Sequence, residues 1–230
     1  MNNKIVKIIV EILLALAAVA LVWLIYASIM EPVNFNKEKA AREEVAIQRL
    51  KDIRTIEVAY KAVTNHFTAD PDSLVLFYNT GKMEVVMQIG SQDDSLAMAN
   101  TAAIRKKNRK ITNEQLLELY HQGQPLVFSI STPLAVKDTL FASRENFVID
   151  SIIYIPFSGG KKVEMDAIVK MVSGVQVPLF EARMPYDDLL KGLDRQLIVN
   201  LKADRENQNK YEGLQVGSVS APNNNAGNWE

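Results

Sequence analysis

Apolar residues are concentrated in one uninterrupted run near the N-terminus. Residues 12–30 read ILLALAAVALVWLIYASIM and contain no charged side chain. At about 1.5 Å per residue, this run and the apolar residues just before it cross a hydrocarbon core of about 30 Å. The run is longer than the roughly 7–15 apolar residues of a cleavable signal peptide, and no clean small-residue cleavage site follows it. The pattern therefore predicts an uncleaved transmembrane helix over 8–30.

A second helical pattern follows in the stem, residues 31–67. The stretch 36–67 contains neither Gly nor Pro. Its apolar residues recur every three or four positions, which places them on one helix face: Leu50, Ile53, Ile56, Tyr60, Val63 and Phe67. We expect this face to pack on the core of its own domain, so that a charge at Ile56 or Val63 unfolds it. The alternative is a short coiled coil with another chain, because about two heptads are available.

Residues 68–217 predict an α+β domain that ends in antiparallel strands. Apolar and polar residues alternate over 163–171 with Ile168 as the exception, which is typical of a strand with one wet face. Tight turns around Gly159 and Gly174 separate this strand from its neighbours, so we expect a meander over 147–157, 163–171 and 176–183. Pro178 is expected to mark an edge or an end of the sheet. Two further candidate strands are 83–89 and 126–130.

The sequence predicts one helix of this domain clearly and leaves two other segments ambiguous between helix and extended structure. Thr112 begins a helix over 112–121, and Gln115 stands in the capping-box position. The segment 74–78 fits a short helix or an extended stretch, and 186–200 fits a helix or a strand. The polar segment 92–100 is expected to be a loop. The tail, 218–230, is rich in Asn, Ser, Gly and Ala, and we expect it to be loosely ordered.

The overall fold expected is therefore α+β: a transmembrane helix continues into an amphipathic helix that packs on an antiparallel β-sheet. The chain has 26 basic and 27 acidic residues, a balance that argues against a nucleic-acid partner. It contains no cysteine, which excludes disulfides and thiolate metal sites. Five basic residues cluster between 101 and 110, where they form a solvated face or contact anionic lipid headgroups or a partner: Arg105, Lys106, Lys107, Arg109 and Lys110.

The sequence contains none of the common catalytic or cofactor-binding motifs. No phosphate-binding loop, nucleophile elbow or zinc-protease motif is present. The two histidines, His66 and His121, fall in ordinary polar helical contexts. The paired acids Asp93-Asp94 and Asp187-Asp188 are interpreted as solvated loop residues. We therefore expect a protein that is not an enzyme and that has no cofactor and no metal.

The anchor carries residues that predict how it sits in a membrane. Glu11 lies within the apolar segment one turn beyond Lys7, and it either remains at headgroup depth or has a function in the bilayer. Trp23 and Tyr26 are expected near the outer interface. The short basic tail, 1–7, favours a cytoplasmic N-terminus and a periplasmic main domain at a bacterial inner membrane. Along the stem, the candidate partner contacts are Arg49 and Arg54.

Three stretches are similar to type IV pilins and type II secretion pseudopilins. KIIVEILLALAAVAL (7–21) resembles the pilin stem with its glutamate, residues 50–77 resemble the exit of that stem, and NAGNWE (225–230) resembles the ending of some major pseudopilins. The anchor-and-sheet plan is also similar to envelope proteins of Bacteroidetes. Val6 and Lys7 stand where pilins have the Gly and Phe of the processing site, so prepilin cleavage is not supported.

The resemblance implies a pilin-like periplasmic domain in a structural or assembly role, as part of a secretion or pilus-like envelope machine. The partners expected are membrane lipid together with other envelope proteins or further copies of this chain. The alternative is a membrane-tethered periplasmic sensor or ligand-binding module, which requires a concave apolar pocket.

Overall fold

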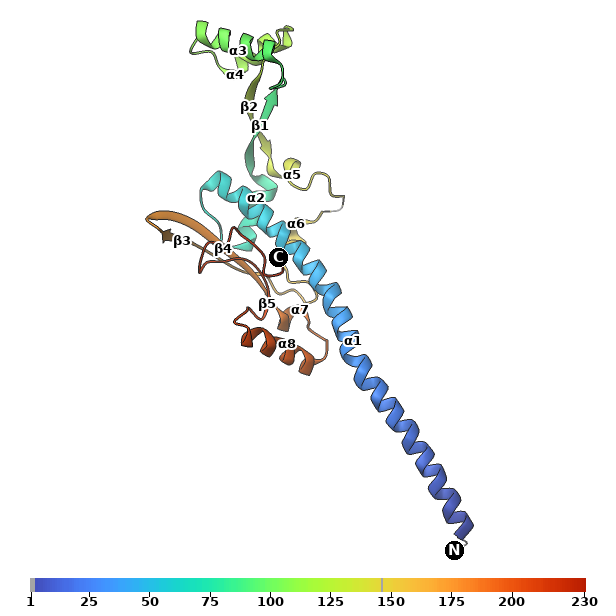
Figure 1. The fold of residues 1–230 in the computed structure, drawn as a ribbon. Coiled ribbons are helices and arrows are strands. Elements are labelled where there is room, and N and C mark those ends of the chain that lie inside the picture. Colours follow the sequence, from blue (N-terminus) through green and yellow to red (C-terminus); the bar gives the residue numbers. More distant parts are fainter. Residues whose placement is uncertain (1–2, 146) are drawn as a thin grey trace.

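One long helix organises the molecule. The computed structural model describes residues 3–145 and 147–230, and helix α1 runs from Asn3 to Thr64 over 62 residues (Figure 1). Pro32 lies inside α1 without ending it. The apolar segment and the stem are therefore one continuous rod, and the long N-terminal apolar helix that the sequence predicted is confirmed.

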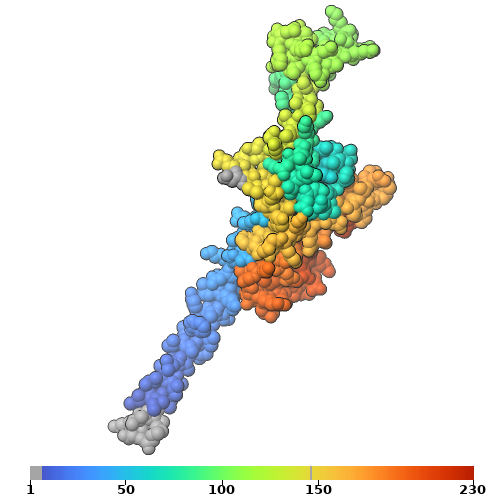
Figure 2. All heavy atoms as spheres, turned by 180° about the vertical axis from the view of Figure 1, so that it is seen from behind, coloured from blue at the N-terminus to red at the C-terminus, as the bar shows by residue number. Residues whose placement is uncertain are grey.

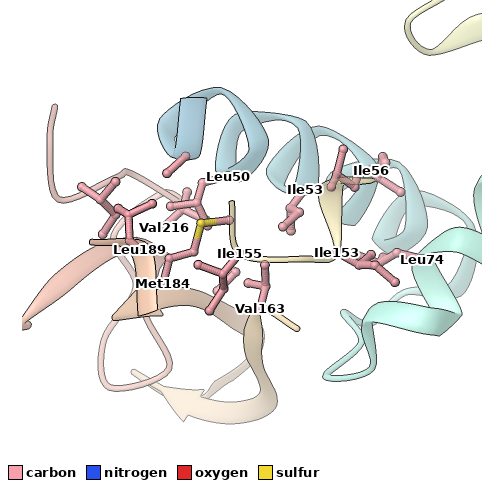
Figure 3. Close-up of a cluster of buried hydrophobic side chains, with 14 of the residues drawn as sticks. Leu50, Ile53, Ile56, Leu74, Ile153, Ile155, Val163, Met184, Leu189 and Val216 are labelled. Carbon is pink, nitrogen blue, oxygen red and sulfur yellow. The ribbon is translucent and has the colours of Figure 1, made fainter. Parts of the chain in front are cut away.

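The second half of α1 is the spine of the hydrophobic core. Leu50, Ile53 and Ile56 are fully buried, and they meet side chains from the sheet and from the loops around it (Figure 3). Each large apolar side chain that is buried in this way contributes about 1.5–3 kcal/mol. Val63 does not share this environment, because 46% of it is exposed. Its predicted packing was wrong, because α1 ends at Thr64 and Phe67 of the segment that follows, in place of Val63, packs against Phe180 of the sheet.

The sheet beneath α1 has three antiparallel strands in the order β3-β4-β5. Strand β3 spans Glu164–Val172, β4 spans Val175–Pro185 and β5 spans Gly213–Gly217. The central strand β4 contributes most of the buried side chains of the sheet, among them Phe180, Ala182 and Met184. Strand β5 pairs with β4 only from Glu181 to Pro185, so Pro178 lies beyond that pairing, where its missing N–H is not needed.

The predicted meander is wrong in its first strand. Residues 149–152 form one turn of helix, α6 (Ile149–Ile152), and the third strand of the sheet is β5. The apolar run in 147–157 lacks the polar alternation of a half-exposed strand, and its isoleucines are buried in the core instead: Ile149, Ile152, Ile153 and Ile155. A short apolar run does not distinguish a buried strand from a buried turn of helix.

A narrow arm leaves the body at the end opposite the N-terminus. It is a two-stranded antiparallel ribbon of β1 (Lys82–Ile89) and β2 (Phe128–Ala135), paired from Lys82 opposite Ala135 to Ile89 opposite Phe128. Helix α2 (Pro71–Thr80) enters the arm and the short helix α5 (Val136–Thr139) leaves it. Figure 2 shows the ribbon as a thin neck between the body and a small cap.

Two helices form the cap of the arm: α3 (Ser95–Lys107) and α4 (Asn113–His121). They enclose a small core of Leu116, Leu126 and Phe128. The expected capping box of Thr112 and Gln115 is confirmed at the start of α4. The expected loop over 92–100 is wrong in its second half, because Asp94 caps α3 by accepting hydrogen bonds from two backbone N–H groups.

The C-terminal third closes the body. Helix α7 (Tyr186–Leu189) and helix α8 (Arg195–Asn207) occupy the segment 186–200 that the sequence left open. After β5, Gly227 bridges to Val216, and Trp229 packs against the main core. The last residues, 218–230, thus return to α1 in place of the loose tail that we expected.

The contrast between Ile56 and Val63 gives a matched test of this packing. Ile56→Asp is expected to destabilise the domain by more than about 4 kcal/mol, because a charge enters a dry core without a partner. Val63→Asp is expected to change stability by less than about 0.5 kcal/mol, as surface substitutions do. Urea unfolding in detergent micelles, followed by circular dichroism, measures both. Equal losses in the two variants would contradict the packing described here.

Candidate functional site

The N-terminal half of α1 stands free of the rest of the protein. Side chains from Lys7 to Asn34 are exposed or only partly covered, whereas Phe35 is the first buried residue of the helix. Among the described residues, one helix is long and apolar enough to cross a membrane, and it is this one. Exposed leucine, isoleucine and valine over more than 20 consecutive positions are stable in lipid and not in water.

The membrane-contact candidates of the anchor, Glu11, Trp23 and Tyr26, lie on this free segment. Glu11 is exposed on the rod, one turn beyond Lys7. Trp23 and Tyr26 are about two-thirds exposed and lie one turn apart, beside Val19 and Val22. The spacing of about 18 Å between Glu11 and Trp23, at 1.5 Å per residue, separates the polar start of the segment from its aromatic end.

The two stem arginines bind the protein's own loops. The Arg49 guanidinium donates a 2.6 Å hydrogen bond to the carbonyl oxygen of Tyr154, and burial lowers its pKa. Arg54 donates to the carbonyl oxygen of Asn225 and forms a 2.7 Å ion pair with Glu230. Both arginines therefore connect α1 to the body of the same chain. The contacts of Arg54 hold the C-terminal residues against the helix.

The basic run is in the cap of the arm, far from the free segment of α1 (Figure 1). The C-terminal turn of α3 carries Arg105, Lys106 and Lys107, and the turn that leads to α4 carries Arg109 and Lys110. All five side chains are exposed. Within the described part of the chain none of them forms an ion pair, and Arg105 donates a 3.3 Å hydrogen bond to the amide oxygen of Asn113.

Three of the four paired aspartates have a structural role, and the two histidines lie in separate parts of the fold. Asp94 caps α3, and Asp187 and Asp188 form ion pairs with Lys202 and Lys161. His66 stacks edge-on against Tyr60 at the end of α1, whereas His121 ends α4 in the cap. The fold therefore does not bring the two histidines together. Among the described residues no three potential ligands from His, Cys, Asp and Glu are grouped to hold a metal ion.

An open groove runs along one side of the stem. It has a volume of about 760 Å³ and lies between α1 and the segment around α6. Its floor holds Asp52, which accepts hydrogen bonds from Arg144 at 2.6 Å and from Gln48 at 3.0 Å. Exposed Val45 and Val148 add apolar surface at its walls. No local pattern predicts this groove, because its two walls are about 100 residues apart in the sequence.

A buried carboxyl group lies in the core and was missed at the sequence level. Glu57 is completely buried, its Oε2 accepts a hydrogen bond from the backbone N–H of Thr68, and its Oε1 has no partner among the described residues. Desolvation raises the pKa of Glu57 to about 8. The sequence did contain a signal, because Glu57 lies four residues after Ile53 and three before Tyr60, on the apolar face of α1.

A second polar contact ties α1 to the C-terminal helices. The phenol of Tyr186 donates a 2.5 Å hydrogen bond to Glu43 and accepts one of 2.9 Å from Arg205. Tyr186 is fully buried, and burial together with Glu43 raises the pKa of its phenol. The three side chains link α1, α7 and α8 at the end of the body nearest the free segment.

Comparisons with protein-family models, with curated proteins and with solved structures found no match to this chain.

Glu57 predicts a pH-dependent stability. The carboxyl keeps its proton up to about pH 8 when folded, and its ordinary pKa is 4.5. Between these values the folded chain binds one more proton than the unfolded chain. The free energy of unfolding therefore falls as pH rises from 4.5 to 8, at about 1 kcal/mol per pH unit.

Glu57→Gln is expected to remove this slope and to be more stable than the parent chain at pH 8. Urea midpoints at several pH values measure the effect, and Glu44→Gln on the exposed side of α1 is the control. The same slope in the parent chain and in Glu57→Gln would show that the carboxyl is ionised inside the fold.

Proposed function

We propose that this chain is a single-pass membrane-anchored structural protein whose main domain takes part in an envelope assembly. The observation that carries the proposal is the continuity of α1, whose free apolar half becomes the spine of a folded body without any linker. In this proposal residues 1–7 lie in the cytoplasm, 8–30 span a bacterial inner membrane and the body is periplasmic.

The rigid connection supports a mechanical role. Residues 31–64 of α1 extend about 50 Å at 1.5 Å per residue. The eight-residue strands of the arm add about 25 Å in the direction away from the anchor. A flexible linker would leave the domain free to explore a wide volume, whereas this chain holds its cap at a set height above the bilayer.

We further propose that the assembly is pilin-like, a secretion or pilus-like machine. Support comes from an apolar helix with a glutamate near its start and from an amphipathic continuation that packs on antiparallel strands. In the proposed assembly the stem helices of neighbouring subunits lie side by side. The exposed stripe of α1 offers a surface for that contact: Lys37, Ala41, Glu44, Gln48, Lys51, Thr55, Val58 and Ala62.

The groove beside α1 favours a second candidate, a tethered sensor or ligand-binding module. A volume of about 760 Å³ is in the range of small-molecule sites. The groove is open along its side, and its polar floor is already satisfied by the contact between Asp52 and Arg144. Binding of a small molecule that is lost in Asp52→Asn would support this module over the structural role.

The anchor can be tested by fractionation. The full chain is expected to remain in the membrane pellet after alkaline carbonate washing, and a chain lacking residues 1–30 is expected to be released. Immunoblots of the two fractions measure this, together with the N-terminal sequence of the mature protein. Recovery of the native protein in the aqueous fraction without its first thirty residues would contradict the anchor.

The assembly role can be tested by site-specific crosslinking, because the chain has no cysteine. Single substitutions Ala41→Cys, Gln48→Cys and Thr55→Cys sample the exposed stripe of α1. In intact membranes we expect at least one of them to give a crosslinked product larger than the monomer with a short thiol crosslinker. Lys210→Cys, exposed beyond α8, is the control for random collisions. Monomer alone at all three positions would contradict the proposal.

A further inference from the structure

The cap of the arm presents its longest helix to the outside. Helix α3 lies across the far end of the ribbon, away from the N-terminus (Figure 1). Its inner side is fixed: Ala97 and Thr101 are buried, and the Thr101 hydroxyl accepts a 2.9 Å hydrogen bond from the N–H of Val127. Residues on the opposite side of α3 therefore face away from the whole molecule.

That outward side combines apolar and cationic side chains. Near the start of α3, Leu96 is 63% exposed and Met98 is 47% exposed, and because they are two positions apart they lie on opposite flanks of this side. Its centre is formed by Ser95, Ala99, Ala102 and Lys106. Exposed alanines follow, and the helix ends in the cations Arg105 to Lys107, with Arg109 and Lys110 in the next turn. Apolar side chains are not held at an exposed site by folding, and cations without ion pairs contribute little to the stability of the cap.

The acidic groups of the cap do not form ion pairs with its cations. Asp94 accepts hydrogen bonds from the N-terminal N–H groups of α3, at the end opposite the cations, and Asp93 precedes it. Glu114 and Glu118 lie on α4, where Glu114 follows Asn113, the residue that Arg105 contacts. The cationic end of α3 therefore keeps an excess of positive charge within a surface that also has apolar side chains.

We propose that the outward side of α3 binds the surface of a lipid bilayer that contains anionic phospholipids, opposite the membrane that holds the anchor. A surface helix that exposes both apolar and Lys/Arg side chains can lie flat in a bilayer interface. Anionic headgroups attract such cations individually. This inference rests on the proposed anchor and gives the arm a partner: the chain bridges two bilayers at the height set by α1 and the ribbon.

Vesicle tethering tests the bridge with the full chain. The protein is reconstituted through its own apolar segment into phosphatidylcholine vesicles. Labelled acceptor vesicles of phosphatidylcholine, with or without phosphatidylglycerol, are then added, and co-sedimentation is measured. We expect capture of the anionic acceptors, little capture of the neutral ones, and loss of capture in high salt.

Two sets of substitutions distinguish binding by the outward side of α3 from attraction by the overall charge of the protein. Lys106→Gln, Lys107→Gln and Arg109→Gln together are expected to reduce capture by at least about tenfold. The control replaces three exposed cations elsewhere, Lys137→Gln, Arg195→Gln and Lys210→Gln, and is expected to retain capture. Leu96→Ser with Met98→Ser tests the apolar contribution and is expected to weaken capture without changing the net charge.

The outcomes that overturn the inference are distinct. Equal vesicle capture by the triple variant of the cap (Lys106, Lys107 and Arg109) and by the control variant would show that overall charge attracts the vesicles. Binding of soluble polyglutamate without vesicle capture would indicate that the outward side of α3 binds an acidic protein instead. Loss of tethering while the stem crosslinks persist would leave the assembly role intact and remove this inference alone.

Discussion

One continuous helix is exposed in its first half and packs on the core in its second half, and the rest of the structure depends on that continuity. Helix α1 is apolar on every side of its free half, as a membrane-spanning helix requires, and apolar on one face where it packs on the core. The change takes place near Phe35, the first residue that the body covers. Because α1 is helical across this point, any tilt of its free half is transmitted to the sheet, the groove and the arm.

The core accepts buried polar groups at the places where other elements are attached to this rod. Glu57 binds the N–H of Thr68, where the chain reverses after α1. Glu43 receives the phenol of Tyr186, where the C-terminal helices begin. Removing one partner of either hydrogen bond lowers the stability of the fold, because the other polar group is then buried without a partner. They therefore specify where loops attach, whereas the apolar side chains supply most of the stability.

Local patterns predicted part of this architecture and could not predict the rest. The apolar run, the strand β3 and the capping box at Thr112 depend on near neighbours in sequence, and the structure confirms them. The alternation in β3 holds only from Glu164 to Ala167, because Val169 and Met171 extend beyond the part of the sheet that the body covers and are exposed. The short helix α6, the pairing of β5 and the exposure of Val63 depend on which distant segment covers each residue. Of the candidate contacts, Arg49 and Arg54 are bound to their own domain for the same reason: their partners, Tyr154 and Glu230, are more than 100 residues away.

The direction of α1 also constrains how the open edge of the sheet can pair. In the described residues β3 has β4 on one side and no strand on the other, and the far end of the β3–β4 hairpin exposes Val169, Met171 and Val175. Such an edge can pair with another strand. Two copies joined by antiparallel β3 edges would be related by an axis perpendicular to the sheet. Because α1 lies across the face of the sheet (Figure 1), that axis reverses the direction of α1. If the free halves of α1 span a membrane as proposed, two copies joined in this way do not enter the same membrane, and the proposed anchor opposes aggregation through this edge.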